Sequence, residues 1–288
     1  GAPQAEEVVR LRVEDPIQPA TQRYIERGLE TAADRGAVLV VLELDTPGGL
    51  LDSTREITTA ITASTVPVVV YVTPAGGRAA SAGFFILMAA DVAAMAPGTN
   101  TGAAHPVSGQ GQEMPEDVRD KATNDAAAMI RSLASERGRN VDLAVEAVVE
   151  SSSFTAQEAL DAELIDLIAA DLGDLLAQLD RREVIRFGGD VGEALQLEDA
   201  TVHEIPPTTA ERLLSVLANP NIAYLLMALG MLGIYVEVTH PGGIFPGVVG
   251  VIAILLALYS LSVLPVSLAG VALIGFAFLL FLLEVKVA

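Results

Sequence analysis

The sequence predicts an α/β domain with a mostly parallel sheet, followed by a C-terminal α-helical transmembrane region. The α/β class follows from strands and helices that alternate at short spacing across residues 37–96. The membrane region follows from residues 238–283, which contain no Asp, Glu, Lys or Arg. An uncharged stretch of this length is typical of a membrane and not of a globular core.

Two apolar runs predict the central strands. Residues 37–44 and 66–73 are nearly continuous apolar stretches, the pattern of parallel strands that are buried on both faces. The expected strands are residues 8–13, 37–44, 66–73 and 92–96, with 184–187 and 201–205 closing the domain. The expected helices are residues 21–35, 51–63, 115–137, 141–149 and 156–170, together with a helix that starts near Ser81.

We expect three parts along the chain. Residues 1–180 form the α/β domain, 181–218 add closing strands and a juxtamembrane helix, and 219–288 hold the transmembrane helices. Two runs of 18 residues, 247–264 and 266–283, flank Pro265. At 1.5 Å per residue each reaches roughly 27 Å, just enough to span. A shorter run, 222–236, either spans when extended by its flanks or is re-entrant.

Charge and composition exclude several classes of partner. The net charge is −20, and beyond Arg212 the charged residues are Glu237, Glu284 and Lys286 alone. No basic patch offers itself to nucleic acid, and the absence of cysteine excludes thiolate metal sites. We expect no cofactor and no metal. An acidic, cysteine-free domain that begins with small residues favours an extracytoplasmic location on a cell-membrane anchor.

Ser81 is the candidate nucleophile. It follows the apolar run 66–73 and precedes a helical run, and its neighbours are Ala and Gly. Small neighbours let a substrate backbone approach, and the helix N-terminus adds a positive field. The alternative is that Ser81 only caps a buried, alanine-rich helix.

A second turn offers backbone donors. The buried strand 37–44 leads into Thr46-Pro47-Gly48-Gly49, and a tight turn of this kind leaves N–H groups that can hold an oxyanion. Ala82, the neighbour of Ser81, supplies another N–H. These donors and a serine make an acyl-transfer site that still needs a base.

Two residues compete for the role of base. Lys121 is the only lysine in residues 1–212, where every other cation is arginine. Arginine stays protonated, whereas a desolvated lysine can lose its proton. His105 lies 24 residues after Ser81 and could pair with it. The alternatives are a chance surface lysine and a histidine that lines a loop.

The order of several short motifs resembles the Clp-protease-like superfamily of serine peptidases, and above all the membrane-bound NfeD group. The motifs are Thr46-Pro47-Gly48-Gly49, Ala79-Ala80-Ser81-Ala82-Gly83, Met95-Ala96-Pro97-Gly98-Thr99, and Glu158-Ala159-Leu160 with Leu164-Ile165-Asp166. The resemblance covers roughly residues 7–180, and the membrane helices of the family cover the remainder.

This resemblance implies a Clp/crotonase-like spiral of ββα units and a Ser–Lys dyad. Ser81 would be the nucleophile and Lys121 the base, with Gly49 and Ala82 as oxyanion donors and Gly48 as the alternative to Gly49. It also implies a stomatin-type membrane protein as substrate or partner. Soluble Clp proteases complete a triad with His and Asp, but residues 151–153 are serines where that Asp would fall.

The leading interpretation is a membrane-anchored serine endopeptidase that contacts lipid, acts on a polypeptide and forms a homo-oligomer of two or more copies. The apolar residues Phe84, Phe85 and Ile86 after the nucleophile favour an apolar substrate segment. A second interpretation is a non-catalytic scaffold that binds a stomatin-like partner through residues 222–283. A third is an acyl-CoA crotonase, which would need an Arg-lined site for the CoA phosphates and no Ser81.

Overall fold

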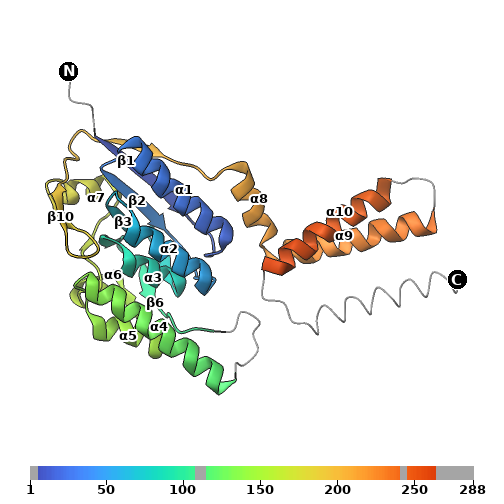
Figure 1. Ribbon diagram of the computed structural model, residues 1–288, viewed down its shortest axis with the longest axis horizontal. Helices are drawn as coiled ribbons and strands as arrows, with labels where there is room; N and C mark the ends of the chain where they lie inside the picture. Colours follow the sequence, from blue (N-terminus) through green and yellow to red (C-terminus); the bar gives the residue numbers. More distant parts are fainter. Residues whose placement is uncertain (1–5, 108–114, 241–244, 264–288) are drawn as a thin grey trace. The chain divides into compact units, whose positions relative to one another are not determined.

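The computed structural model describes residues 6–107, 115–240 and 245–263 (Figure 1). The chain divides into two compact units, one that ends at Glu211 and one that begins at Arg212. The expected boundary at residue 180 falls inside the first unit, because a strand after it joins the central sheet.

The first unit is built on a six-stranded sheet in the order β11-β1-β2-β3-β5-β8, with every neighbouring pair parallel. Every residue of β2 and β3 is buried, which explains their continuous apolar sequence. The strands are β1 (Glu7–Val13), β2 (Leu39–Leu44), β3 (Val68–Val72), β5 (Val92–Met95), β8 (Leu167–Ile168) and β11 (Thr201–Glu204).

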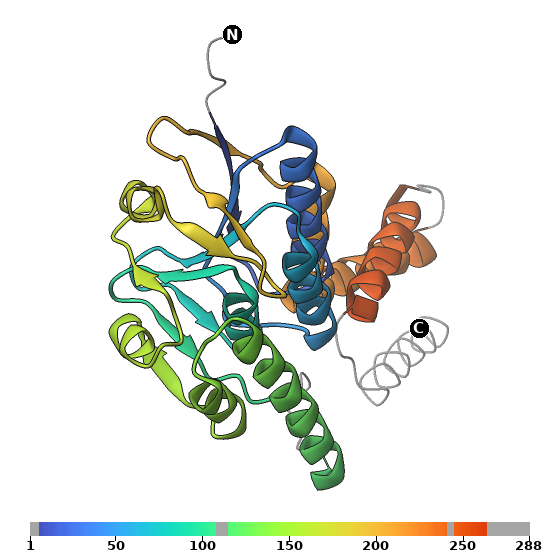
Figure 2. The same cartoon turned by 60° about the vertical axis from the view of Figure 1, so that its left-hand side comes forward.

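Packed elements cover both faces of this sheet. Helices α1 (Pro19–Arg35), α2 (Leu51–Ala63) and α3 (Ala82–Ala89) cover one face with the larger apolar core, and Figure 2 shows the first two side by side. The other face is covered by α7 (Leu172–Leu179) and by a two-stranded antiparallel hairpin. The central strands β2 and β3 are therefore buried on both faces, whereas the edge strand β11 is exposed.

A second, three-stranded sheet has the order β4-β6-β7. Its strands are β4 (Arg78–Ala80), β6 (Asn100–Gly102) and β7 (Ser153–Thr155). The chain repeats a ββα unit, first as β3, β4 and α3 and then as β5, β6 and α4 (Glu116–Glu136). In each unit the first strand joins the large sheet and the second joins the small one. This arrangement places the start of α3 where the two sheets meet.

The prediction of one helix over residues 156–170 is wrong in part. The predicted helix 156–170 begins with the expected capping box of Thr155 and Glu158, but α6 (Ala156–Asp161) ends early. Glu163 adopts φ +56°, a turn conformation, and the chain then pairs with β5 as β8. The strand predicted at 184–187 is present with slightly shifted bounds as β9 (Glu183–Ile185), and it pairs with β10 (Val191–Ala194).

The first turn of α8 (Thr209–Leu217) contains Glu211, which forms an ion pair with Arg27 of α1. The Glu211 carboxylate accepts hydrogen bonds from Arg27 Nε and Nη2 at 2.9 and 2.8 Å. The Thr208 N–H donates to the same carboxylate at 2.7 Å. The bond to Arg27 is the main cause that lowers the pKa of Glu211. Glu211, the last residue of the first unit, is thus held against α1.

The second unit contains α9 (Pro220–Thr239) and α10 (Phe245–Val263), which pack as an antiparallel pair. A Cβ placed on Gly233 would lie 2.6 Å from the Pro246 carbonyl oxygen, and one on Gly250 would lie 2.7 Å from that of Gly230. The two backbones therefore approach too closely for any side chain larger than hydrogen. Small residues at such a seam are typical of helix packing in membranes.

Residues 221–239 of α9 are long and apolar enough to span a membrane, with a mean hydropathy of 1.8. The run 222–236, expected to be a short span or re-entrant, lies within this helix. The apolar stretch Phe245–Leu261 of α10 is shorter and overlaps the expected span 247–264. The expected span 266–283 lies outside the described residues, so the number of spans stays a prediction.

Candidate active site

Ser81 connects β4 to α3 in a strained backbone conformation. Its φ and ψ are 52° and −112°, a region that costs free energy for any residue with a Cβ and is often found at functional sites. Its N–H donates to the Gly102 carbonyl at 2.9 Å, and the residue is half-buried. Although Ser81 occupies the N-cap position, its side chain makes no capping hydrogen bond. The hydroxyl therefore does not make the capping hydrogen bond that the alternative interpretation assumes.

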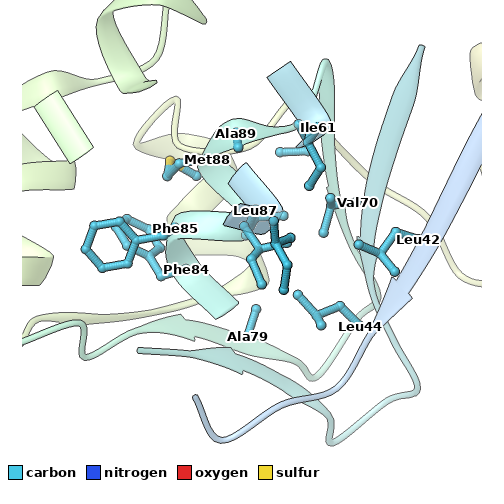
Figure 3. Close-up of a cluster of buried hydrophobic side chains, with 14 of the residues drawn as sticks. Leu42, Leu44, Ile61, Val70, Ala79, Phe84, Phe85, Leu87, Met88 and Ala89 are labelled. Atoms are coloured by element: carbon cyan, nitrogen blue, oxygen red, sulfur yellow. The ribbon is translucent and has the colours of Figure 1, made fainter. Parts of the chain in front are cut away.

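The helix behind Ser81 is core throughout. Figure 3 shows side chains of α3 among those of β2, β3 and α2. Phe84, Phe85 and Ile86 are 0, 3 and 0% exposed. Because these side chains are buried, they cannot line a substrate groove. The prediction that they favour an apolar substrate is wrong for this reason: a helix that is apolar all round is a core helix.

The Gly48-Gly49 turn lies directly against the side chain of Ser81. A Cβ on Gly48, which has φ +114°, would lie 2.6 Å from Ser81 Cβ and 3.1 Å from its Oγ. A Cβ on Gly49 would lie 2.0 Å from the Ile17 carbonyl oxygen. Only glycine fits at either position. The structure thus brings together the two motifs that the sequence placed about 30 residues apart.

The hydrogen bonds show which of the candidate oxyanion donors already has an acceptor in the protein. The Gly48 N–H donates to Thr46 Oγ1 at 3.2 Å. Among the hydrogen bonds of the described residues, the N–H groups of Gly49 and Ala82 have no acceptor. Ala82 is the first residue of α3, where N–H groups have no partner within the helix. Gly49 and Ala82 are therefore available to a ligand, and Gly48 is not.

Lys121 lies on the second turn of α4 and is exposed. In the part of the chain that the structure describes, no hydrogen bond joins it to Ser81. Further along, α4 is fixed to α2 by an ion pair between Arg55 and Asp125 and is buried at Ile130. The structure does not assemble the predicted dyad, whose closure on substrate binding stays a prediction.

His105 contacts a backbone carbonyl. Its Nδ1 lies 3.0 Å from the Val148 oxygen, and a carbonyl can only accept, so Nδ1 donates. No carboxylate contacts the ring within the described ranges. Ser152, where a triad acid was sought, donates from its hydroxyl to Glu146 Oε1 at 2.8 Å. A Ser–His–acid triad is not assembled.

Two arginines that the sequence analysis did not single out hold the far end of α3. Arg137 donates to the Ala89 carbonyl at 3.0 and 2.6 Å. Arg139 donates to the carbonyls of Met88 and Ala90 at 2.7 and 3.0 Å. Burial is the main cause that lowers the pKa of Arg137. The positive groups neutralise the C-terminal carbonyls of the helix whose other end carries Ser81.

Comparison with known families covers almost the whole chain. The model of the NfeD1b N-terminal domain matches residues 7–204, and that of the NfeD integral membrane domain matches residues 221–288. The chain belongs to the NfeD family. This confirms the predicted family, and the membrane domain makes this NfeD chain a membrane protein.

Two curated relatives are similar to this NfeD chain over most of its length. The membrane-bound protease PH1510 of Pyrococcus horikoshii is 35% identical over 279 residues, which cover 95% of this chain and 62% of the relative. The membrane protein NfeD1b of Bacillus subtilis is 32% identical over 269 residues, or 90% and 57%. The chain thus spans about three fifths of the length of these relatives.

Solved structures confirm the predicted α/β fold. The 1510-N membrane-bound stomatin-specific protease, solved as a lysine-to-alanine mutant with a substrate peptide, has a TM-score of 0.67 to the NfeD chain and 33% identity. The match covers 73% of this chain and 97% of that one. A serine-to-alanine mutant of 1510-N gives a TM-score of 0.65 and 33% identity, covering 71% and 100%.

Proposed function

We propose that this NfeD chain is a membrane-anchored serine endopeptidase with Ser81 as nucleophile and Lys121 as base. The observation that carries the proposal is the strained backbone of Ser81. Its hydroxyl makes no capping hydrogen bond and lies against the Gly48-Gly49 turn. The Gly49 and Ala82 N–H groups supply the oxyanion donors. An oxyanion site of two backbone amides beside a serine is suited to acyl transfer.

Ser81, Lys121, the two backbone N–H groups and one water molecule account for every bond and proton of the proposed reaction. Neutral Lys121 takes the Ser81 proton as Oγ attacks the carbonyl carbon, and the carbonyl oxygen becomes the oxyanion. Collapse breaks the C–N bond, and the leaving amine takes the proton from Lys121. Water then hydrolyses the acyl-enzyme by the same proton path. Lys121 must come within hydrogen-bond reach of Ser81, so movement of the first turns of α4 on substrate binding is part of the mechanism.

The substrate class comes from the relatives. The structural relative is named as specific for stomatin and was solved with a peptide. We therefore place a segment of a stomatin-type membrane protein as the substrate, with the enzyme acting as a homo-oligomer in contact with lipid. Since Phe84, Phe85 and Ile86 are buried, an apolar cleavage segment is supported only by the membrane setting of enzyme and substrate.

One observation favours the scaffold as a second candidate. Lys121 is exposed and is not hydrogen-bonded to Ser81 in the described part of the chain. A chain whose dyad never closes would bind a stomatin-type partner through its membrane helices without cleaving it. The two candidates differ in whether Ser81 reacts.

A fluorophosphonate label on the full chain in detergent tests the proposal. Wild type should be labelled and should cleave a stomatin-derived peptide, and Ser81→Ala should lose both activities. Ser152→Ala, which removes another serine hydroxyl outside the site, is the control and should behave as wild type. Equal labelling of wild type and Ser81→Ala would contradict the proposal. Absence of labelling with intact partner capture would favour the scaffold.

We also propose that the first unit is extracytoplasmic. The support is its acidic, cysteine-free composition. Protease added to intact spheroplasts should then digest residues 1–211 and leave a membrane-protected fragment. A cytoplasmic marker protein serves as the control for cell integrity. Full protection of the first unit would place it in the cytoplasm.

A further inference from the structure

Thr46 is a buried polar residue at the entrance to the Gly48-Gly49 turn. It follows β2 and is 0% exposed. Its Oγ1 accepts a hydrogen bond from the Gly48 N–H at 3.2 Å and donates to the Gly48 carbonyl oxygen at 3.3 Å. One hydroxyl therefore contacts both polar groups of the same glycine. Such short-range bonds from Thr are used to set the shape of turns.

The bond to the carbonyl fixes the orientation of a peptide group. The Gly48 oxygen also accepts the Ile17 N–H at 2.8 Å. A trans peptide is planar, so its C=O and the following N–H point in opposite directions. Holding the Gly48 oxygen toward Ile17 and Thr46 therefore holds the Gly49 N–H away from them. A flipped peptide would withdraw this donor and present a carbonyl oxygen in its place.

Thr46 also contacts the segment that carries Ser81. A Cβ on Gly83, in the first turn of α3, would lie 2.7 Å from Thr46 Cγ2. The Thr46 N–H donates to the Arg78 carbonyl at 2.7 Å, and its carbonyl accepts the Ala80 N–H at 3.1 Å. The same residue thus spaces the Gly49 turn from the strand and helix on either side of Ser81.

We propose that Thr46 is a positioning residue whose hydroxyl keeps the Gly48-Gly49 peptide oriented with the Gly49 N–H available to the oxyanion. The inference rests on the proposed function, in which Gly49 is an oxyanion donor and Ser81 the nucleophile. Thr46 itself touches no reacting atom. The hydroxyl of Thr46 is required for this orientation, and the methyl group is secondary. Two substitutions can test the two groups separately.

Thr46→Val removes the hydroxyl and keeps the shape of the side chain, whereas Thr46→Ser keeps the hydroxyl and removes the methyl. Deleting an oxyanion donor costs about 10²–10³ in kcat, and a displaced donor should cost less. In the full chain, Thr46→Val should lower kcat about 10- to 100-fold with KM within about twofold of wild type. Thr46→Ser should stay within about threefold of the wild-type kcat.

A transition-state analogue separates positioning from a purely structural role. A peptidyl aldehyde forms an oxyanion with Ser81, so its affinity should fall in Thr46→Val by the same factor as kcat/KM. The affinity of the uncleaved peptide, measured with Ser81→Ala in both backgrounds, should not change. A structural role alone would lower the melting temperature and leave the affinity ratio of the two ligands as in wild type.

Each outcome decides the inference. Wild-type kcat in Thr46→Val, or equal losses in Thr46→Val and Thr46→Ser, would overturn it while leaving the peptidase intact. If Thr46→Val does not fold, Thr46→Ala takes its place in the comparison with Thr46→Ser. Cleavage that survives Ser81→Ala, or a wild type that does not cleave, is a failure of the proposed function itself and overturns the inference with it.

Discussion

Lys121→Ala should lower kcat/KM for peptide cleavage several hundredfold, whereas His105→Ala should leave most of the activity. A nucleophile and its base act as a unit, so loss of the base costs nearly as much as loss of the nucleophile. Lys121 is the only lysine before residue 213. Within the described residues, His105 Nδ1 contacts the Val148 carbonyl and not the carboxylate that stabilises an imidazolium in a triad.

Lys121→Arg distinguishes a base from a charge. Arginine keeps the positive charge but stays protonated, so this variant should be as inactive as Lys121→Ala. Arg119→Ala, which removes an exposed cation from the same helix turn, is the matched control and should retain activity. Steady-state kinetics and acyl-enzyme formation measure the effect. If Lys121→Ala lost little activity and His105→Ala lost as much as Ser81→Ala, His105 and not Lys121 would be the base.

Local sequence patterns predicted most of the first unit because its strands are strongly apolar and its longer helices are amphipathic. Residues 51–63 are a helix with the predicted bounds, and the continuous runs are the buried strands. The prediction failed over residues 156–170. Strand β8 in this stretch has only two residues and is formed by pairing with β5. The Asp166 carboxylate accepts the Ala93 N–H at 2.7 Å. No local pattern encodes such a partner.

The candidate site divides in the same way. Ser81, Gly48 and Gly49 were found from sequence because tight turns after apolar strands require small residues. The choice between Gly48 and Gly49 depends on the Thr46 hydroxyl, whose direction the sequence does not give. Phe84 reads as apolar whether it faces a substrate or the core, and only packing distinguishes the two. Arg137 donates to a carbonyl that lies 48 residues earlier in the sequence, and no short motif predicts such a contact.

Asp91→Ala should lower the free energy of unfolding by about 3–5 kcal/mol, because it leaves a buried guanidinium without its counter-ion. The side chains of Asp91 and Arg137 are 1 and 2% exposed and lie 2.7 Å apart. Asp91 also accepts the Val68 N–H at 2.8 Å and lies 3.3 Å from Arg186. It therefore ties the end of α3 to β3 and to the β9–β10 hairpin.

Urea unfolding of the full chain in detergent, followed by far-ultraviolet circular dichroism, measures this loss. Asp120→Ala, which breaks an exposed pair with Arg119, is the control and should cost less than about 1 kcal/mol. Combining Asp91→Leu with Arg137→Met should cost less than the sum of the single changes, because neither member of the Asp91–Arg137 pair then stays buried without the other, although Arg186 still loses Asp91. The Ala89 carbonyl would still lose its donor, so recovery should be incomplete. An Asp91→Ala chain as stable as Asp120→Ala would show that the buried pair does not hold α3.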